Sequence, residues 1–262
     1  MREIAQTLSL IIGIFIPEYI NFIDIVRCNL GNDSLNTDNI IFYILLNFNN
    51  WIAGVLFSAC ILCFLIRKYN GQAILNSGNR YHDKPYFWYV FCSYILGYKR
   101  CNLVLVPIYT QYRLVLNDIF SEYLFADDLL EEKPCRITVV IENECMCDNT
   151  INLVIEDTYP IRKHQLPIRL RETYTVFINR ERKFLGERVY CKELIEKVIE
   201  VIKSFDKTVN VNIFSTTNSK NTYGIIKQAI ATATRGNIRH VYVFQQEEWG
   251  ERVFIDKEHK IR

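Results

Sequence analysis

The longest uncharged segment of the chain lies near its N-terminus. No Asp, Glu, Lys or Arg occurs from Asn39 to Ile66, and this run is longer than the roughly 20 residues that cross a bilayer. The pattern predicts a membrane span at about 40–66. Three amides interrupt its first half. They face either another helix or a pore lumen, or they lie in the headgroup region. These amides are Asn47, Asn49 and Asn50.

A second apolar segment, at about 4–25, is weaker because Pro17, Glu18 and Asp24 interrupt it. A secretory signal peptide is a rival interpretation, but few basic residues precede the apolar core and no A-x-A-like cleavage site follows it. We therefore predict a short or tilted first span, and a two-helix transmembrane hairpin over residues 1–68.

The basic residues around these segments predict the orientation of the hairpin. Arg67 and Lys68 directly follow the second span, whereas residues 28–38 contain neither Lys nor Arg. Because basic residues concentrate on the cytoplasmic side of membrane helices, we expect a multi-pass protein with its C-terminal domain in the cytoplasm.

The chain changes character after the second span. Residues 69–84 are polar and contain two glycines, which predicts a linker. The segment Pro85–Tyr98 is uncharged and aromatic but too short to cross a bilayer. It predicts a buried or interface-lying helix that Gly97 could end. We place it at the start of a cytosolic domain over residues 85–262.

The cytosolic part alternates between strand and helix patterns. Short apolar or alternating runs predict strands at Asn102–Tyr109, Arg136–Ile141, Ile151–Ile155, Glu172–Ile178, Val209–Phe214, Ile238–Phe244 and Arg252–Ile255. Apolar residues at helical spacing predict helices at Tyr112–Phe125, Tyr190–Phe205 and Thr222–Thr234. This order is typical of a layered, Rossmann-like α/β domain with a largely parallel sheet. The polar residues of Val209–Phe214 predict an edge or half-exposed strand.

Charge and cysteine content narrow the choice of ligand and compartment. The net charge is +2, and the basic excess lies beyond residue 66, which favours an anionic ligand or lipid surface. The nine cysteines are interpreted as reduced thiols of a cytosolic domain. Cys145 and Cys147 form a C-x-C pair, but no second Cys or His pair stands at a zinc spacing, so we expect no metal.

The best candidate site is the polar turn Ser215–Gly224, between a predicted strand and a predicted helix. Hydroxyls, amides, a Lys and helix N-terminal N–H groups are the parts of an anion site. The alternative is ordinary capping of the helix by Ser or Thr. The candidate ligand contacts in this turn are Thr216, Thr217, Asn218, Ser219, Lys220 and Asn221.

Two further segments could contribute to this site. The stretch 162–188 is rich in Arg, whose planar guanidinium binds phosphate through two donors, and the candidates are Arg169, Arg171 and Arg180. The alternative for these arginines is a solvated surface facing anionic lipid. Tyr109 and Gln111 follow the predicted strand Asn102–Tyr109, so they could line the same crevice as the turn if the two strands are neighbours.

Motifs for catalysis are missing from the chain. No Ser–His–Asp arrangement stands out among the four His, and no HExxH, HxH or GxSxG motif occurs. We therefore do not expect an enzyme, although a membrane-tethered enzyme acting on lipid or nucleotide stays a hypothesis.

From Val209 onward the chain resembles the end of the SAVED family of sensor domains, relatives of the CARF domains. The carrying segments are VNVNIF (Val209–Phe214), STTNSKNTYG (Ser215–Gly224), IIKQAIATAT (Ile225–Thr234) and IRHVYVF (Ile238–Phe244). The resemblance is a pattern of strand, turn, helix and strand rather than an invariant motif.

The resemblance implies a function as well as a fold. SAVED-like domains bind cyclic oligonucleotides in CBASS or type III CRISPR antiphage signalling and are fused to effectors. By this resemblance the chain would be an inner-membrane effector, with the spans as its harmful part. A cyclic oligonucleotide made by a partner nucleotide cyclase would make it oligomerise and disrupt the bilayer. The ligand contacts would be the turn at Thr216–Asn221 and the arginines around 169–180. A protein-binding adaptor and a STING-like membrane sensor are the alternatives.

Overall fold

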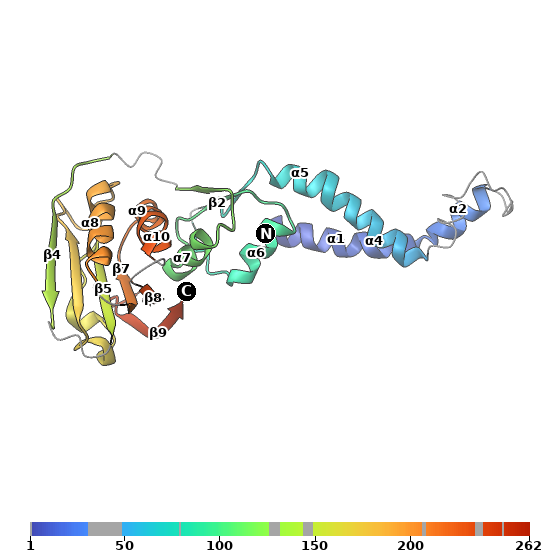
Figure 1. Ribbon diagram of the computed structural model, residues 1–262. Coiled ribbons are helices and arrows are strands. Elements are labelled where there is room, and N and C mark those ends of the chain that lie inside the picture. The colour runs from blue at the N-terminus through green and yellow to red at the C-terminus, as the bar shows by residue number, and fades with distance from the viewer. Residues whose placement is uncertain are drawn as a thin grey trace. The chain divides into compact units, whose positions relative to one another are not determined.

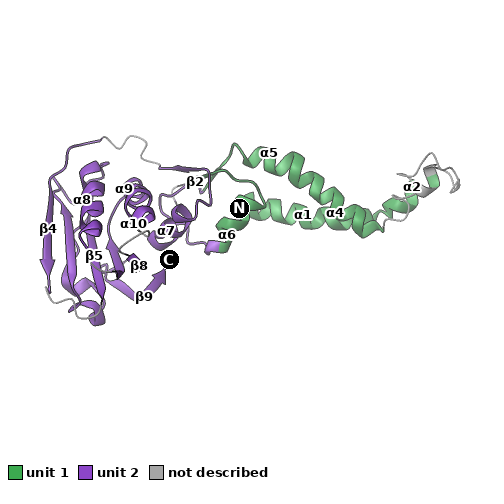
Figure 2. Ribbon diagram, viewed as in Figure 1, with its two compact units in different colours: residues 1–75, 87–100 green, residues 76–86, 101–262 purple. Residues whose placement is uncertain are grey.

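The computed structural model describes residues 2–30, 49–78, 80–125, 132–143, 149–205, 208–233, 238–247 and 249–262. The chain divides into two compact units, which Figure 2 distinguishes by colour. Unit 1 comprises residues 1–75 and 87–100, and unit 2 comprises residues 76–86 and 101–262. The aromatic segment after residue 86 therefore packs with the N-terminal helices, not with the α/β unit in which we had placed it.

Unit 1 is helical (Figure 1). Its elements are α1 (Arg2–Tyr19), α2 (Phe22–Leu30), α4 (Asn50–Cys60), η2 (Ile61–Ile66), α5 (Arg67–Asn70), the short strand β1 (Ile74–Leu75) and most of α6 (Tyr86–Tyr94). Among the described residues, the helix Asn50–Asn70 is the one that is long and apolar enough to cross a bilayer. Residues 40–48 of the predicted second span lie outside the described residues.

The predicted first span, about 4–25, is interrupted. Helix α1 ends at Tyr19 and α2 begins at Phe22, with Asn21 between them at φ 49°. Pro17 lies inside α1 near this end, and a proline removes a backbone hydrogen bond of the helix. Asn adopts the left-handed backbone conformation more readily than most residues do. The helix therefore ends before Asn21, and a new helix begins after it.

The side chains of the two described asparagines at the start of α4 make different hydrogen bonds. Asn49 caps its own helix, because its side chain accepts a hydrogen bond from the backbone N–H of Trp51. The Oδ1 atom of Asn50 accepts from the backbone N–H of Ile23, 2.9 Å away in α2. Asn50 therefore faces a neighbouring helix, one of the two predicted alternatives, and Asn47 lies outside the described residues.

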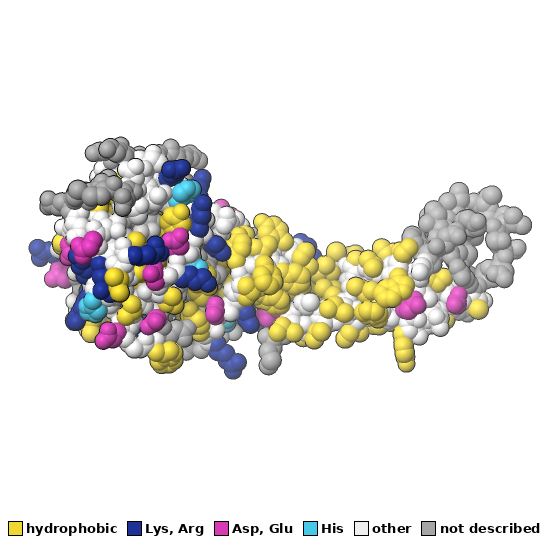
Figure 3. Space-filling view, turned by 90° about the horizontal axis from the view of Figure 1, so that it is seen from below, with side chains coloured by type: hydrophobic (Ala, Val, Ile, Leu, Met, Phe, Trp, Pro, Cys, Tyr) yellow, Lys and Arg dark blue, Asp and Glu magenta, His cyan; other side chains and the backbone are white. Residues whose placement is uncertain are grey.

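Small residues let α1 and α4 approach closely. A Cβ atom at Gly54 would overlap the backbone carbonyl of Ile14, and the Ser58 hydroxyl donates a hydrogen bond to the carbonyl of Leu10 at 2.8 Å. Such small-residue contacts are how helices associate in lipid. Figure 3 shows hydrophobic side chains gathered over these helices. Those most exposed include Ile4, Leu8, Ile12, Phe15, Val55, Leu56, Phe64 and Leu65.

Unit 2 contains a six-stranded sheet in the order β4-β6-β5-β7-β8-β9 (Figure 1). Its strands are β4 (Ile137–Glu142), β5 (Thr150–Glu156), β6 (Thr175–Arg180), β7 (Val209–Ser215), β8 (Ile238–Gln246) and β9 (Phe254–Lys260). The four central strands are parallel, and the two outer strands pair antiparallel to them. The mixed α/β fold predicted from alternating patterns is present.

Helices and short 3-10 turns cover the sheet. These elements are α7 (Ile108–Leu116), η3 (Lys163–Gln165), η4 (Ile168–Leu170), α8 (Lys192–Lys203), α9 (Ser219–Gly224), η5 (Ile225–Ile230) and α10 (Ala231–Ala233). Helix α8 packs against η5. The segment 161–170 contributes Ile161, Leu166 and Leu170 to a buried cluster with Phe214 and Phe244. Two short strands, β2 (Arg100–Asn102) and β3 (Glu122–Leu124), complete the unit.

The prediction of a strand over Asn102–Tyr109 is wrong. β2 ends at Asn102, whose side chain accepts a hydrogen bond from the backbone N–H of Val104, and Leu105 has φ 57°. Pro107 then precedes α7. The predicted helix Tyr112–Phe125 is correspondingly displaced to Ile108–Leu116. The run is apolar because Leu103 and Val106 are buried, and burial alone does not distinguish a strand from a loop.

The prediction that Val209–Phe214 is an edge strand is also wrong, because β7 lies between β5 and β8. Its polar position Asn212 is buried and donates from Nδ2 to Oδ1 of Asn152 at 3.1 Å. Asn152 in turn donates to the carbonyl of Leu170 at 2.7 Å. The amides of Asn212 and Asn152 therefore find hydrogen-bond partners inside the sheet and need no solvent.

The glycine contact predicts how unit 1 responds to a single methyl group. We expect Gly54→Ala to lower the thermal unfolding midpoint of the full chain in detergent, because overpacking at a tight contact costs about 1–3 kcal/mol. Gly13→Ala is the matched control, since a Cβ there meets its nearest atom at 3.4 Å. Equal midpoints for the two variants would contradict this close approach.

Candidate ligand-binding edge of the sheet

The carboxyl ends of the parallel strands define one edge of the sheet. Because β6, β5, β7 and β8 run in the same direction, the residues that follow them meet at this edge, where open α/β sheets bind ligands. Asp157 follows β5, the polar turn Thr216–Asn221 follows β7, and Glu247 follows β8. The sequence predicted this position for the turn but did not identify Asp157.

Asp157 is fully buried and is the centre of a polar network at this edge. Its Oδ1 accepts from Nε of Arg180 at 2.6 Å. Its Oδ2 accepts three hydrogen bonds, from the backbone N–H and Nδ2 of Asn218, both at 3.1 Å, and from Nδ2 of Asn221 at 2.9 Å. The carboxylate therefore joins the ends of β5 and β6 to the turn after β7.

Arg180 is 1% exposed and makes its contacts inside the protein. Besides Asp157, it contacts Glu187 through Nη1 at 3.1 Å and donates from Nη2 to the backbone carbonyl of Glu187 at 2.8 Å. The structure therefore links Arg180 to the predicted turn, as expected for a common site, but through Asp157 and not at the surface. Its role in the edge is to position the turn.

Charge pairing sets the ionisation of this network. Burial raises the pKa of Asp157, while the hydrogen bond from Asn221 and the charge of Arg180 oppose that rise. Burial lowers the pKa of Arg180, but the charge of Asp157 and the hydrogen bonds to Asp157 and Glu187 together outweigh burial, so the Arg180 pKa lies above its ordinary value. The backbone N–H of Lys183, together with Arg180, holds the pKa of Glu187 below its ordinary value.

Within the turn, most polar groups already have protein partners. Oδ1 of Asn218 accepts from the backbone N–H groups of Lys220 and Asn221 at 3.1 and 2.9 Å. The Thr216 hydroxyl donates to the carbonyl of Tyr159 at 2.7 Å, and Thr217 contacts two neighbouring hydroxyls. The capping alternative therefore holds, with Asn218 rather than Ser or Thr as the cap. Four residues of the turn line a cavity, and Lys220 is the charged one among them: Thr217, Asn218, Ser219 and Lys220.

That cavity, which we call the turn hollow, measures about 130 Å³. It is lined by Val104, Leu105, Phe125, Thr158, Arg188, Thr217, Asn218, Ser219 and Lys220. Two of these side chains are basic, Arg188 and Lys220, and none is acidic. Lys220 also lies 5.0 Å from the ring centre of Tyr190. The turn hollow thus combines positive charge with hydroxyl groups at the strand ends.

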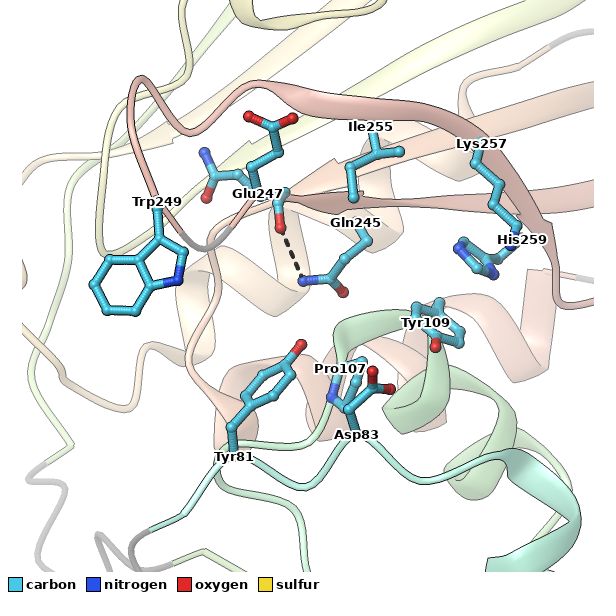
Figure 4. Close-up of a pocket in the computed structure, with 11 residues that line it drawn as sticks. Tyr81, Asp83, Pro107, Tyr109, Gln245, Glu247, Trp249, Ile255, Lys257 and His259 are labelled. Atoms are coloured by element: carbon cyan, nitrogen blue, oxygen red, sulfur yellow. Dashed lines mark hydrogen bonds between the residues drawn. The ribbon is translucent and has the colours of Figure 1, made fainter.

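A larger cavity, the aromatic hollow, measures about 550 Å³ and lies at the end of β8 (Figure 4). Its lining includes Tyr81, Asp83, Pro107, Tyr109, Gln245, Gln246, Glu247, Trp249, Ile255, Lys257 and His259. Tyr109 stacks on His259 with ring centres 3.7 Å apart. Burial, with the charges of Lys257 and Arg113, lowers the pKa of His259, which favours its neutral ring. Trp249 is 83% exposed.

The loop Leu103–Ile108 separates the two hollows. On one side the Ser219 hydroxyl donates to the carbonyl of Leu103 at 3.3 Å. On the other side the backbone N–H of Ile108 donates to Oε1 of Gln245 at 3.0 Å. The apolar residues before α7 therefore contact the turn through this loop, and not through the end of a strand as the sequence predicted.

The structure places Tyr109 and Gln111 apart from the turn. Both lie in α7, because the helix begins earlier than the sequence predicted. Tyr109 lines the aromatic hollow, whereas Gln111 is buried and donates from Nε2 to the carbonyl of Val106 at 2.8 Å.

Arg169 and Arg171 are not brought to the turn either. They precede β6, so they lie toward the amino end of that strand. Arg169 pairs with Asp256 at 2.7 Å and Glu258 at 3.1 Å on the exposed face of β9. Arg171 donates to the carbonyls of Leu166 and His164 at 3.0 and 2.6 Å. The sequence shows the positive charge of these two arginines but does not predict their partners, which lie elsewhere in the chain.

The chain thus combines an apolar helical unit with an α/β unit that has two cavities at the carboxyl ends of its parallel strands. The chain belongs to the SMODS- and ubiquitin system-associated 2TM effector family, whose family model matches residues 1–262. No curated protein matches the chain.

Among solved structures, the chain is similar to the Acinetobacter baumannii Cap4 SAVED/CARF-domain containing receptor in two complexes. The TM-scores are 0.44 for the complex with the cyclic trinucleotide 3'3'3'-cAAA and 0.43 for that with 2'3'3'-cAAA, both at 9% identity. Each match covers 65% of this chain and 40% of the receptor, so the chain spans less than half of the receptor's length.

The two kinds of arginine predict different effects on stability. We expect Arg180→Met to destabilise the full chain by about 3–5 kcal/mol, because it leaves the buried Asp157 charge unpaired. Arg169→Met removes two exposed ion pairs, with Asp256 and Glu258, and because each contributes about 0–1 kcal/mol the loss should be smaller. Thermal and denaturant unfolding in detergent measure both, and a loss for Arg169→Met as large as for Arg180→Met would contradict the central role of Asp157.

Proposed function

We propose that this protein is an inner-membrane effector of antiphage defence that binds a cyclic oligonucleotide at the carboxyl edge of unit 2. Ligand made by a nucleotide cyclase drives the cytoplasmic units to oligomerise, and the clustered helices of unit 1 then disrupt the bilayer. The observation that carries the proposal is the pairing, at one sheet edge, of a small basic hollow with a large aromatic one. Membership in an effector family with SMODS association supports it.

The turn hollow is suited to a phosphate group. Lys220 and Arg188 supply positive charge, and hydrogen bonds from cationic donors to phosphate oxygens are stronger than neutral ones. Its volume of about 130 Å³ leaves no room for a whole nucleoside. The Asp157 network holds the backbone of the turn from below, so Lys220 is presented from a rigid support.

The aromatic hollow is suited to a nucleobase. Trp249 and Tyr81 offer ring faces, and stacking on such rings contributes about 1–3 kcal/mol per base. Its volume of about 550 Å³ is sufficient for a nucleotide. Because the Leu103–Ile108 loop borders both hollows, a ligand with alternating phosphates and bases contacts the ends of β7 and β8 together.

Unit 1 supplies the membrane part of the proposal. The helix Asn50–Asn70 is long enough to span a bilayer, and its outward side chains are apolar. Arg67 and Lys68 follow the apolar stretch, which favours the cytoplasm for the side on which unit 2 follows. Helices α1 and α2 accompany it as the second element of a two-transmembrane effector.

Ligand binding tests the site. Full-length protein in detergent should bind at least one member of a panel of cyclic di-, tri- and tetranucleotides. Lys220→Ala should weaken that binding about 10- to 100-fold, because a charged hydrogen bond contributes about 1.5–3 kcal/mol. Trp249→Ala should weaken it by a similar factor through lost stacking. Isothermal titration or thermal shift gives the affinities.

Exposed basic residues elsewhere provide the controls for this experiment. Lys192→Ala removes a lysine that pairs with Glu196 on the surface of α8 and should leave affinity unchanged. Arg171→Ala tests the basic segment that the sequence also favoured. If Arg171→Ala abolished binding and Lys220→Ala did not, the ligand would bind at the opposite end of the strands and the proposed site would be rejected.

Dye release tests the effector activity. Liposomes that contain the reconstituted chain should leak after addition of the nucleotide that binds, and the Lys220→Ala protein should need a proportionally higher concentration. Protein without nucleotide is the control. Saturating nucleotide without leakage would refute membrane disruption while leaving the binding site intact.

A further inference from the structure

Two thiols and a carboxylate converge in unit 2, away from both hollows. Cys135 lies shortly before β4, Cys191 directly precedes α8, and Glu193 lies in the first turn of that helix. The two sulfur atoms and a Glu193 oxygen all lie within 4.8 Å of one another. Cys135 and Cys191 are far apart in sequence, so motifs that identify zinc sites by the short spacing between ligands do not include them.

The separation between the Cys191 sulfur and the Glu193 carboxylate matches that of two ligands in a tetrahedral metal centre. With metal–sulfur bonds of about 2.3 Å and metal–oxygen bonds of about 2.0–2.2 Å, a tetrahedral ion holds a sulfur and an oxygen ligand about 3.6 Å apart. The Cys191 sulfur lies 3.6 Å from Oε2 of Glu193. Cys191 and Glu193 are therefore spaced to share one ion, and the Cys135 sulfur lies within 4.8 Å of both donor atoms.

Burial and access are also suitable. Cys191 is fully buried, whereas Cys135 is partly exposed and lines a separate cavity of about 500 Å³. Solvent in that cavity can supply a fourth ligand, and the negative charge that a cation needs comes from the thiolates and Glu193, because the charged residues that line the cavity are mostly basic. The other buried cysteines, Cys92 and Cys101, belong to no such cluster of donors among the described residues.

The cluster adjoins the support of the ligand edge. The backbone N–H of Cys191 donates to Oδ1 of Asn221 at 3.1 Å. Two residues earlier, the carbonyl of Val189 accepts from Nδ2 of Asn218 and of Asn221 at 2.9 and 3.0 Å. An ion bound at Cys191 would fix the backbone that holds the turn after β7.

We propose that Cys135, Cys191 and Glu193 form a structural site for a thiophilic divalent cation of the Zn²⁺ class, with a solvent molecule as fourth ligand. Binding converts both thiols to thiolates, releases their two protons to solvent and changes no oxidation state. The site is independent of the nucleotide proposal.

Cobalt titration tests this site on the full chain. Reduced, metal-stripped protein in detergent is titrated with Co²⁺, and we expect one equivalent to produce a sulfur-to-cobalt charge-transfer band that Zn²⁺ abolishes by displacement. Cys191→Ser and Cys135→Ser should lose the band, and Glu193→Gln should weaken Co²⁺ binding at least tenfold. Cys101→Ser and Glu196→Gln, a buried thiol and an exposed carboxylate outside the cluster, should retain it.

A second measurement needs no variant. Zn²⁺ should slow alkylation of Cys135 in the wild-type protein, with the modified residue located by mass spectrometry. Absence of the cobalt band in reduced wild-type protein would overturn the proposal, as would a band of equal strength in Cys191→Ser. A Cys135–Cys191 disulfide in freshly purified protein that binds no cobalt after reduction would also overturn it and assign the pair to redox chemistry.

Discussion

The buried ion pair between Asp157 and Arg180 is the constraint on which the ligand edge depends. Two opposite charges lie among the ends of three strands, and each oxygen of the carboxylate is satisfied. Pairs of this kind contribute little net stability compared with apolar residues, but losing one partner is costly. Their effect here is geometric, because one carboxylate holds Asn218 and Asn221 and thereby the conformation of the turn after β7.

This inward bonding decides which groups of the turn remain for a ligand. Asn218 uses its side chain to cap the following helix and to contact Asp157, so the amides of the turn are largely occupied. Lys220 is left to face the turn hollow together with Arg188. The Leu103–Ile108 loop closes the other side of this hollow and begins the wall of the aromatic hollow. A basic cavity and an aromatic cavity therefore lie on either side of one loop.

The helical unit follows a different physical rule. Its helices approach closely at Gly54 and Ser58 through backbone and hydroxyl contacts, while many large apolar side chains are exposed. In water this arrangement is unfavourable, whereas in lipid it is the expected one. Polar contacts such as that of Asn50 with Ile23 satisfy the backbone at a helix end, where the bilayer offers no partner.

The sequence by itself determined the elements whose signal is local. The β-branched runs of β4, β5 and β8 predicted strands, and the apolar face of α8 predicted a helix, at the positions where the structure has them. Only the tertiary structure shows the environment of side chains whose partners are distant in sequence. From the sequence alone, Asn212 is expected to face solvent, but in the structure it donates a hydrogen bond to Asn152, sixty residues earlier. Arg180 is likewise expected at the surface, but in the structure it is buried between Asp157 and Glu187. A buried apolar loop and a buried strand have the same composition, so the path from Asn102 to Ile108 was fixed only by packing.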